Sequence, residues 1–193
     1  MSQEAALSLF KESGAYLDGH FLLTSGMHSP AYVEKFRVLE HPAICDQLCA
    51  MMAEPFKNEK IDVVLGPAVG GILLAYGVAR ALGCRSVFME REEGVLKLRR
   101  GFEIKADERV LLVEDVVTTG SSVFEMLSAL SLERGAGGLA GISFLVDRSN
   151  GVVDFKLPRQ QALLTLDLPV YAPEKCPLCA KGLPLTKRGS RKI

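Results

Sequence analysis

The sequence contains no tryptophan and no charge excess of either sign: 23 acidic residues balance 23 basic ones, so the formal net charge is zero. A chain without a basic excess lacks the electrostatic footprint of a nucleic-acid-binding protein, and we expect no nucleic acid as a partner. Its apolar runs, such as Val110–Val113, are far too short to cross a bilayer. We therefore expect no membrane association either.

The first residues also lack the pattern of a secretory signal. MSQEAALSLFKESG is amphipathic with early acidic residues, rather than a basic segment followed by an apolar one. Five cysteines, an odd number, lie among apolar neighbours or in the single CxxC of Cys176 and Cys179. This usage fits a reducing compartment better than a disulfide framework, so we expect a cytoplasmic protein.

Two nucleotide-binding fingerprints, GxxxxGK[ST] and GxGxxG, are absent as well. The chain instead alternates short apolar runs with helical patterns. Apolar runs flanked by helices indicate a parallel sheet covered on both faces, so we predict an α/β fold with a doubly wound, mostly parallel sheet. Strands are predicted at Ile61–Gly66, Ser86–Glu90, Arg109–Asp115 and Leu139–Asp147, and helices at Gln3–Ser13, His41–Phe56, 70–83 and Ser121–Gly135.

The remaining segments have different patterns. Residues 14–37 alternate glycine, serine, histidine and aromatic residues, which indicates short strands and turns. The polar, glycine-punctuated stretch between Glu90 and Lys105 is typical of a mobile hairpin or loop. Several prolines after Pro169 predict an irregular extension over about 168–193. A length of 193 residues favours one domain.

The segment VLLVEDVVTTGSSV, Val110–Val123, carries the strongest chemical signal. Its four leading apolar residues predict a buried strand, and Glu114 and Asp115 follow at the carboxyl end, where open α/β sheets bind ligands. Residues 118–122 then supply hydroxyls and a glycine directly before a helix, and such a turn forms an anion site from backbone N–H groups. A ribose 5-phosphate would satisfy both parts, with its hydroxyls on the acids and its phosphate on the amides.

A simpler interpretation is that Thr119 or Ser121 caps the helix and that the two acids are merely solvated. A cap needs only one such residue. The segment combines two acids, two threonines, a glycine and two serines. We therefore favour the functional interpretation.

VEDVVTTGSS resembles the motif with which type I phosphoribosyltransferases bind 5-phosphoribosyl 1-diphosphate (PRPP). The resemblance implies that family's α/β fold, with PRPP as the donor and Mg²⁺ as the cofactor. No protein side chain is assigned to the metal, because Mg²⁺ usually binds through substrate phosphates. The residues that the resemblance assigns to PRPP are Glu114, Asp115, Val116, Val117, Thr118, Thr119, Gly120, Ser121 and Ser122.

Two further segments resemble the orotate phosphoribosyltransferases in particular. Residues 14–42 are similar to that family's N-terminal hood (residues about 1–40 here), with GHF and SGMHSPAY in order, and GPAVGGI is similar to its pyrophosphate-binding loop. The tail CPLCAKGLPL resembles a shorter subgroup of the same family. The resemblance implies transfer of ribose 5-phosphate from PRPP to orotate, giving orotidine 5′-monophosphate and pyrophosphate in pyrimidine biosynthesis.

The resemblance also implies roles for side chains outside the motif. Thr118 and Arg148 would contact orotate, and the planar guanidinium of Arg148 suits the carboxylate. Loop 91–101 would close over the active site of the other subunit of a homodimer. The catalytic residues implied are Asp115, Arg91 and Lys97, with Arg99 and Arg100 as further cations and Arg91 also at PRPP.

The sequence departs from the family pattern at several positions. Some relatives carry Tyr-Lys where this chain has Val69 and Gly70, and a lysine where it has Thr24. The loop also lacks a histidine that many relatives have, and its spacing around Lys97 differs. We expect Lys35 to supply the missing positive charge at PRPP.

Two other functions remain open. A purine or xanthine phosphoribosyltransferase would share the PRPP motif but gives no reason for the SGMHSPAY segment. A PRPP-sensing regulator would bind nucleic acid, and only the basic terminus KRGSRKI favours it.

Cys176 and Cys179 form one possible pair of metal ligands. A zinc site needs four ligands. The sequence shows no evident second pair beyond Cys45, Cys49, His20, His28 and His41. We expect a reduced cysteine pair that is buried or forms a turn, with structural zinc across a dimer as the alternative, and a structural role for His28.

Overall fold

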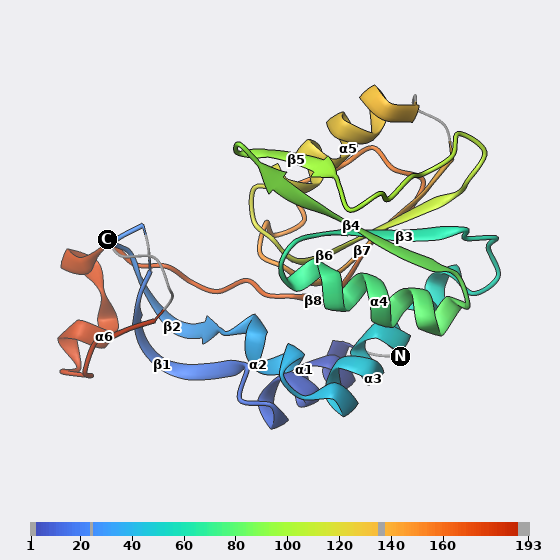
Figure 1. Cartoon of the computed structure of the whole chain (residues 1–193). Helices are drawn as coiled ribbons and strands as arrows, with labels where there is room; N and C mark the ends of the chain where they lie inside the picture. Colours follow the sequence, from blue (N-terminus) through green and yellow to red (C-terminus); the bar gives the residue numbers. More distant parts are fainter. Residues whose placement is uncertain (1–2, 24, 135–137, 189–193) are drawn as a thin grey trace.

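The computed structural model describes residues 3–23, 25–134 and 138–188. Its centre is a six-stranded sheet in the order β5-β4-β3-β6-β7-β8 (Figure 1), in which only β5 pairs antiparallel with its neighbour. The predicted doubly wound, mostly parallel sheet is confirmed. The strands are β3 (Val63–Pro67), β4 (Arg85–Glu92), β5 (Val95–Leu98), β6 (Val110–Val117), β7 (Leu139–Asp147) and β8 (Gln160–Thr165).

Alternate residues of the central strands enter two separate cores, because side chains on a strand point to opposite faces. On β6, Leu111 and Val113 pack against three helices on one face. Val110 and Leu112 pack on the other face against α5. The three helices are α1 (Gln3–Glu12), α3 (Pro42–Ala53) and α4 (Gly70–Leu82), and α5 spans Ser121–Arg134.

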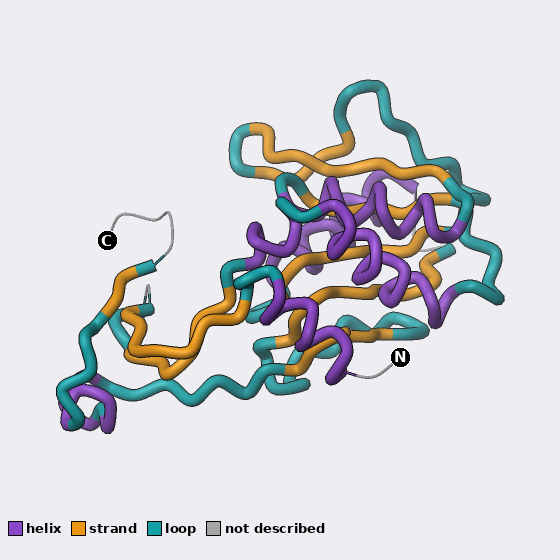
Figure 2. Tube along the Cα trace, turned by 90° about the horizontal axis from the view of Figure 1, so that it is seen from below, coloured by secondary structure: helices purple, strands orange, loops and turns teal. Residues whose placement is uncertain are grey.

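A second sheet of three strands, in the order β2-β1-β9, extends from this core (Figures 1 and 2). Strands β1 (Tyr16–Leu22) and β2 (His28–Val33) pair antiparallel, and the short β9 (Thr186–Lys187) adds to β1 from the other end of the chain. The C-terminal segment therefore runs back along the hood. It contains the 3-10 turn η2 (Pro173–Lys175) and the helix α6 (Pro177–Ala180).

Several elements differ from those predicted. The helix expected to reach Phe56 ends at Ala53, where the 3-10 turn η1 (Glu54–Phe56) contains Pro55. Strand β8 and the short helix α2 (Lys35–Leu39) were not predicted. The stretch after Glu90 was predicted to be either a hairpin or a loop, and it is a hairpin of β4 and β5. No helix within the described part of the chain is long and apolar enough to cross a membrane.

Candidate active site

A cleft with a volume of about 440 Å³ opens where β3 and β6 end side by side. The carboxyl ends of parallel strands are the usual ligand site of such sheets. Glu114 and Asp115 are the only carboxylates among the described residues that line it. The other lining residues are Lys35, Phe36, Pro67, Ala68, Val69, Gly70, Arg91, Leu96, Val116, Thr118 and Ser122.

The acidic pair is buried beside one cation. Glu114 and Asp115 are 6% and 4% exposed, and the Nζ of Lys35 lies 2.6 Å from the Oδ2 of Asp115. The Asp115 backbone N–H also donates to Oε1 of Glu114 at 2.8 Å. Burial, and then the neighbouring Asp115 carboxylate, raises the pKa of Glu114 to about 8. The site thus holds one ionised pair next to a carboxyl group that resists ionisation.

A smaller cavity of about 60 Å³ adjoins the cleft at the start of α5. Residues 116–123 line it together with Glu114, and the hydroxyls of Thr119 and Ser121 lie 2.7 Å apart. Gly120 has φ +75°, and a side chain there would meet Phe155 at 2.7 Å. Because the first N–H groups of a helix have no intrahelical partner, this cavity offers an anion several donors.

The loop between β3 and α4 forms the opposite wall. It includes a cis peptide bond between Ala68 and Val69, and the Ala68 N–H donates to the Met89 carbonyl at 2.7 Å. A Cβ on Gly70 would collide with the carboxylate of Asp115. Glycine at this position therefore lets the start of α4 approach the acidic pair.

The hairpin cations are paired with acids of their own chain. Arg91 lines the cleft but lies 2.7 Å from Glu125 on α5. Lys97 does not line the cleft; it lies 2.9 Å from Glu92. Both Arg99 and Arg100 pair with Glu90.

Arg148 follows β7 and does not line the cleft. Its backbone N–H donates to the Val117 carbonyl at 2.8 Å. Burial and Glu34 raise the pKa of Tyr32 on β2, and the positive charge of Arg148 opposes that shift. The positive charge of Arg148 is therefore felt at the hood. Thr24 lies outside the described residues.

The sequence prediction missed some of the residues that line the cleft. Phe36 and Val69 are 49% and 71% exposed there, and Leu96 reaches it from the hairpin. The GPAVGG motif was the available signal for Val69. Phe36 and Leu96 carry no local signal, because only the packing of distant segments brings them to β6.

Residues 37–154 match the family described as the phosphoribosyl transferase domain. The orotate phosphoribosyltransferase of Pelotomaculum thermopropionicum is 51% identical over 193 residues, which cover all of both chains. That of Thermotoga maritima is 49% identical over 183 residues, covering 95% of this chain and 96% of the relative. The chain belongs to the orotate phosphoribosyltransferase family.

Solved structures share the fold of this family. The orotate phosphoribosyltransferase from Aeropyrum pernix aligns with a TM-score of 0.68 and 24% identity, covering 82% of this chain and 92% of that one. An adenine phosphoribosyltransferase from Rhodothermus marinus aligns with a TM-score of 0.63 and 20% identity, covering 84% of this chain and 99% of that one. The fold alone therefore does not distinguish orotate from adenine as the acceptor.

The raised pKa of Glu114 predicts a specific pH dependence of stability. The folded chain holds the Glu114 proton more tightly than the unfolded chain does, and this difference stabilises the fold. The stabilisation is complete below the ordinary glutamate pKa of about 4.3. It is lost as the pH rises through the folded value of about 8. We expect ligand-free Glu114→Gln to gain a few degrees in Tm relative to wild type between pH 5 and pH 8.5, measured by thermal unfolding.

The matched control is Glu174→Gln, which changes an exposed glutamate. Its Tm difference from wild type should stay constant over the same range. A constant difference for Glu114→Gln as well would contradict the raised pKa.

Proposed function

We propose that the protein transfers the ribose 5-phosphate of PRPP to orotate, giving orotidine 5′-monophosphate and pyrophosphate in pyrimidine biosynthesis. One observation carries this proposal: the single run Glu114–Ser122 contributes both to the wall of the cleft and to the adjoining anion cavity. A ribose phosphate needs these two environments next to each other. Full-length identities of 47–51% to orotate phosphoribosyltransferases support orotate as the acceptor.

PRPP would bind along that run. Glu114 and Asp115 would accept hydrogen bonds from the ribose hydroxyls, and residues 116–122 would hold the 5-phosphate. Lys35 would neutralise Asp115 and attract the anionic donor, which its 2.6 Å contact supports. A structure of the Mycobacterium tuberculosis orotate phosphoribosyltransferase in complex with PRPP, with 24% identity and a TM-score of 0.65, shares this chain's fold.

Cleavage of the bond between C1 and pyrophosphate builds positive charge on the ribose and negative charge on the leaving group. The Asp115 carboxylate beside the ribose and cations beside the pyrophosphate would both stabilise that charge distribution. Arg91 and Lys97 would serve the leaving group after exchanging Glu125 and Glu92 for the pyrophosphate. Closure of loop 91–101 would also exclude water, which otherwise hydrolyses PRPP.

Orotate is already an anion, so the protein has to position it more than to activate it. We assign Thr118 to contact orotate, supported by its place on the cleft wall beside the acidic pair. Arg148 would hold the orotate carboxylate, for which its planar guanidinium is suited. Because Arg148 lies outside the cleft lining, its side chain has to turn toward the bound base.

The cleft also fits a magnesium ion that arrives with PRPP. Mg²⁺ prefers oxygen ligands and commonly keeps substrate phosphates among them. Glu114 and Asp115 are the only carboxylates of the described lining, and no cluster of three ligating side chains forms there among the described residues. The diphosphate would therefore supply most ligands, and the ion would offset charge on the leaving group.

We further propose a cytoplasmic homodimer built on a single domain, with the hood at about 1–40 and an extension from about 168. An exposed apolar stripe supports the dimer: Val69, Leu73 and Tyr76 are 71%, 49% and 61% exposed along one side of α4. Val69 also borders the cleft, so a partner on this stripe would lie beside the site. All five cysteines are free, which fits a reducing compartment.

The direct test is a spectrophotometric assay with PRPP and each candidate base, with and without Mg²⁺. We expect turnover with orotate and none with adenine, hypoxanthine or xanthine. Preferential turnover of a purine would overturn the proposed acceptor. Salt-dependent nucleic-acid binding without turnover would favour a regulator instead.

Lys35→Ala tests the assigned role of the lysine. Removing its charge leaves Asp115 without a cation beside Glu114, so the site would repel the anionic donor. We expect PRPP affinity to fall about tenfold or more and orotate affinity to change much less, measured by calorimetry. Lys60→Ala, at an exposed ion pair with Asp62, is the control and should leave both unchanged. Unchanged PRPP affinity in Lys35→Ala would overturn the role.

A mixed dimer tests whether the loop acts on the partner subunit. If it does, a heterodimer of an inactive Asp115→Asn subunit and an inactive Arg91→Ala subunit has one site free of both defects. Random exchange makes about half of the dimers heterodimers, so about a quarter of wild-type activity should return. Arg91 lines the cleft of its own chain, so action within one subunit is the competing outcome. In that case every mixed site carries a defect, and no activity returns.

A further inference from the structure

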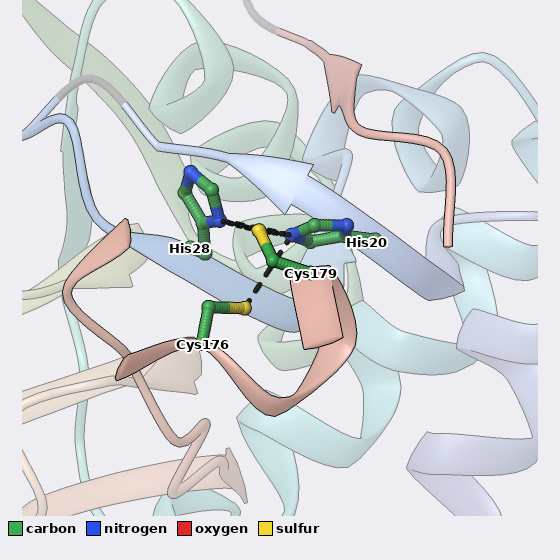
Figure 3. A group of neighbouring side chains, drawn as sticks. All are labelled: His20, His28, Cys176 and Cys179. Carbon is green, nitrogen blue, oxygen red and sulfur yellow. Dashed lines mark hydrogen bonds between the residues drawn. The ribbon is translucent and has the colours of Figure 1, made fainter. Parts of the chain in front are cut away.

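Two histidines of the hood and two cysteines of the C-terminal segment meet in one cluster (Figure 3). His20 lies on β1 and His28 begins β2, whereas Cys176 directly precedes α6 and Cys179 lies within it. Their ligating atoms all lie within 4.8 Å of one another. This is the only such group of metal-ligating side chains among the described residues.

Three of four distances within the cluster suit a tetrahedral ion, and the fourth, between the two histidine nitrogens, is shorter. Nε2 of His20 lies 2.9 Å from Nδ1 of His28 and 3.5 Å from Sγ of Cys176. Sγ of Cys179 lies 3.7 Å from that same His20 atom and 3.3 Å from Nδ1 of His28. In a site with Zn–N bonds of about 2.0–2.1 Å and Zn–S bonds of about 2.3 Å, ligand atoms lie roughly 3.3–3.8 Å apart.

The surroundings of the cluster also match a metal site. The other nitrogen of His20, Nδ1, donates to the Leu183 carbonyl at 2.9 Å, which leaves the lone pair of Nε2 directed at the cluster. Metal-binding histidines commonly have such a second partner, because it sets the tautomer and the ring orientation. His20, His28 and Cys176 are only 3%, 5% and 4% exposed, so an ion there would be shielded from water.

The C-terminal segment has almost no core of its own, so a bound metal ion would stabilise its position. Among residues 166–188, Cys176 is the only buried side chain. Backbone pairing adds two hydrogen bonds between Tyr171 and His28 and two residue pairs between β9 and β1. Small structures with too little apolar burial usually depend on a metal or a disulfide.

We propose that His20, His28, Cys176 and Cys179 bind one structural Zn²⁺ that fastens the C-terminal segment to the hood. Two thiolates and two imidazoles form a ligand set typical of zinc, and four protein ligands leave no open position for catalysis. Binding releases the two thiol protons to solvent, and each imidazole binds in its neutral form. None of the four residues lines the cleft, so this site is separate from the transferase chemistry.

Metal analysis of the purified chain is the direct test. We expect about one zinc ion per wild-type chain, with zinc lost in Cys179→Ser and in His28→Gln. Matched controls are Cys84→Ser and His41→Gln, which change a cysteine and a histidine outside the cluster and should retain the ion. Replacing zinc with Co²⁺ should give the visible absorption of a tetrahedral, thiolate-bound ion, and Cys179→Ser should abolish it.

Limited trypsin digestion supplies a readout that is independent of metal content. Lys175, Lys181 and Lys187 lie in the segment that the ion would hold. Zinc removal by a chelator, or Cys179→Ser, should speed cleavage there about tenfold or more, and zinc should restore protection only to wild type.

Because Cys179 is exposed, its serine variant should fold, so this comparison remains decisive even if His28→Gln does not. Wild type without zinc after expression in zinc-supplemented medium would overturn the proposal. So would a Cys176–Cys179 disulfide, another metal in place of zinc, or full zinc content in Cys179→Ser.

Discussion

The ion pair between Lys35 and Asp115 links the hood to the central sheet, and the geometry of the cleft depends on it. Lys35 begins the helix that follows the last hood strand, whereas Asp115 lies inside β6 with 4% of its surface exposed. Two neighbouring carboxyl groups buried at one strand end would repel each other if both were ionised. One cation and one raised pKa resolve that conflict, and they leave the acids in place for a polyhydroxyl ligand.

The same balance of charge extends to the β4–β5 hairpin. The cations of the β4–β5 hairpin are held by Glu90, Glu92 and Glu125 of the same chain. The pairs of Arg91 with Glu125 and of Lys97 with Glu92 are largely exposed and therefore weak. The small cavity on β6 and α5 thus adjoins a cleft that the hairpin lines with Arg91 and Leu96.

Local patterns predicted the central elements well, because strands β3, β6 and β7 are buried on both faces and begin as apolar runs. The acids and hydroxyls of the β6–α5 segment lie within nine residues, so strand and helix geometry alone brings them together. Lys97 and Arg148 show where this reasoning stops. Their backbone positions follow from the hairpin and from β7, but only the tertiary structure shows that Lys97 pairs with Glu92 and that the charge of Arg148 acts on Tyr32 of the hood.

The sequence by itself determined the central strands β3, β6 and β7, the run of acids and hydroxyls from Glu114 to Ser122 and the family resemblance, since each of these is encoded in contiguous residues. Only the tertiary structure decided what surrounds the CxxC of the tail. His20 and Cys176 are separated by 156 positions, and no local pattern pairs them. They meet because β9 returns the end of the chain to β1, and this long-range strand pairing turns an isolated cysteine pair into a four-ligand cluster.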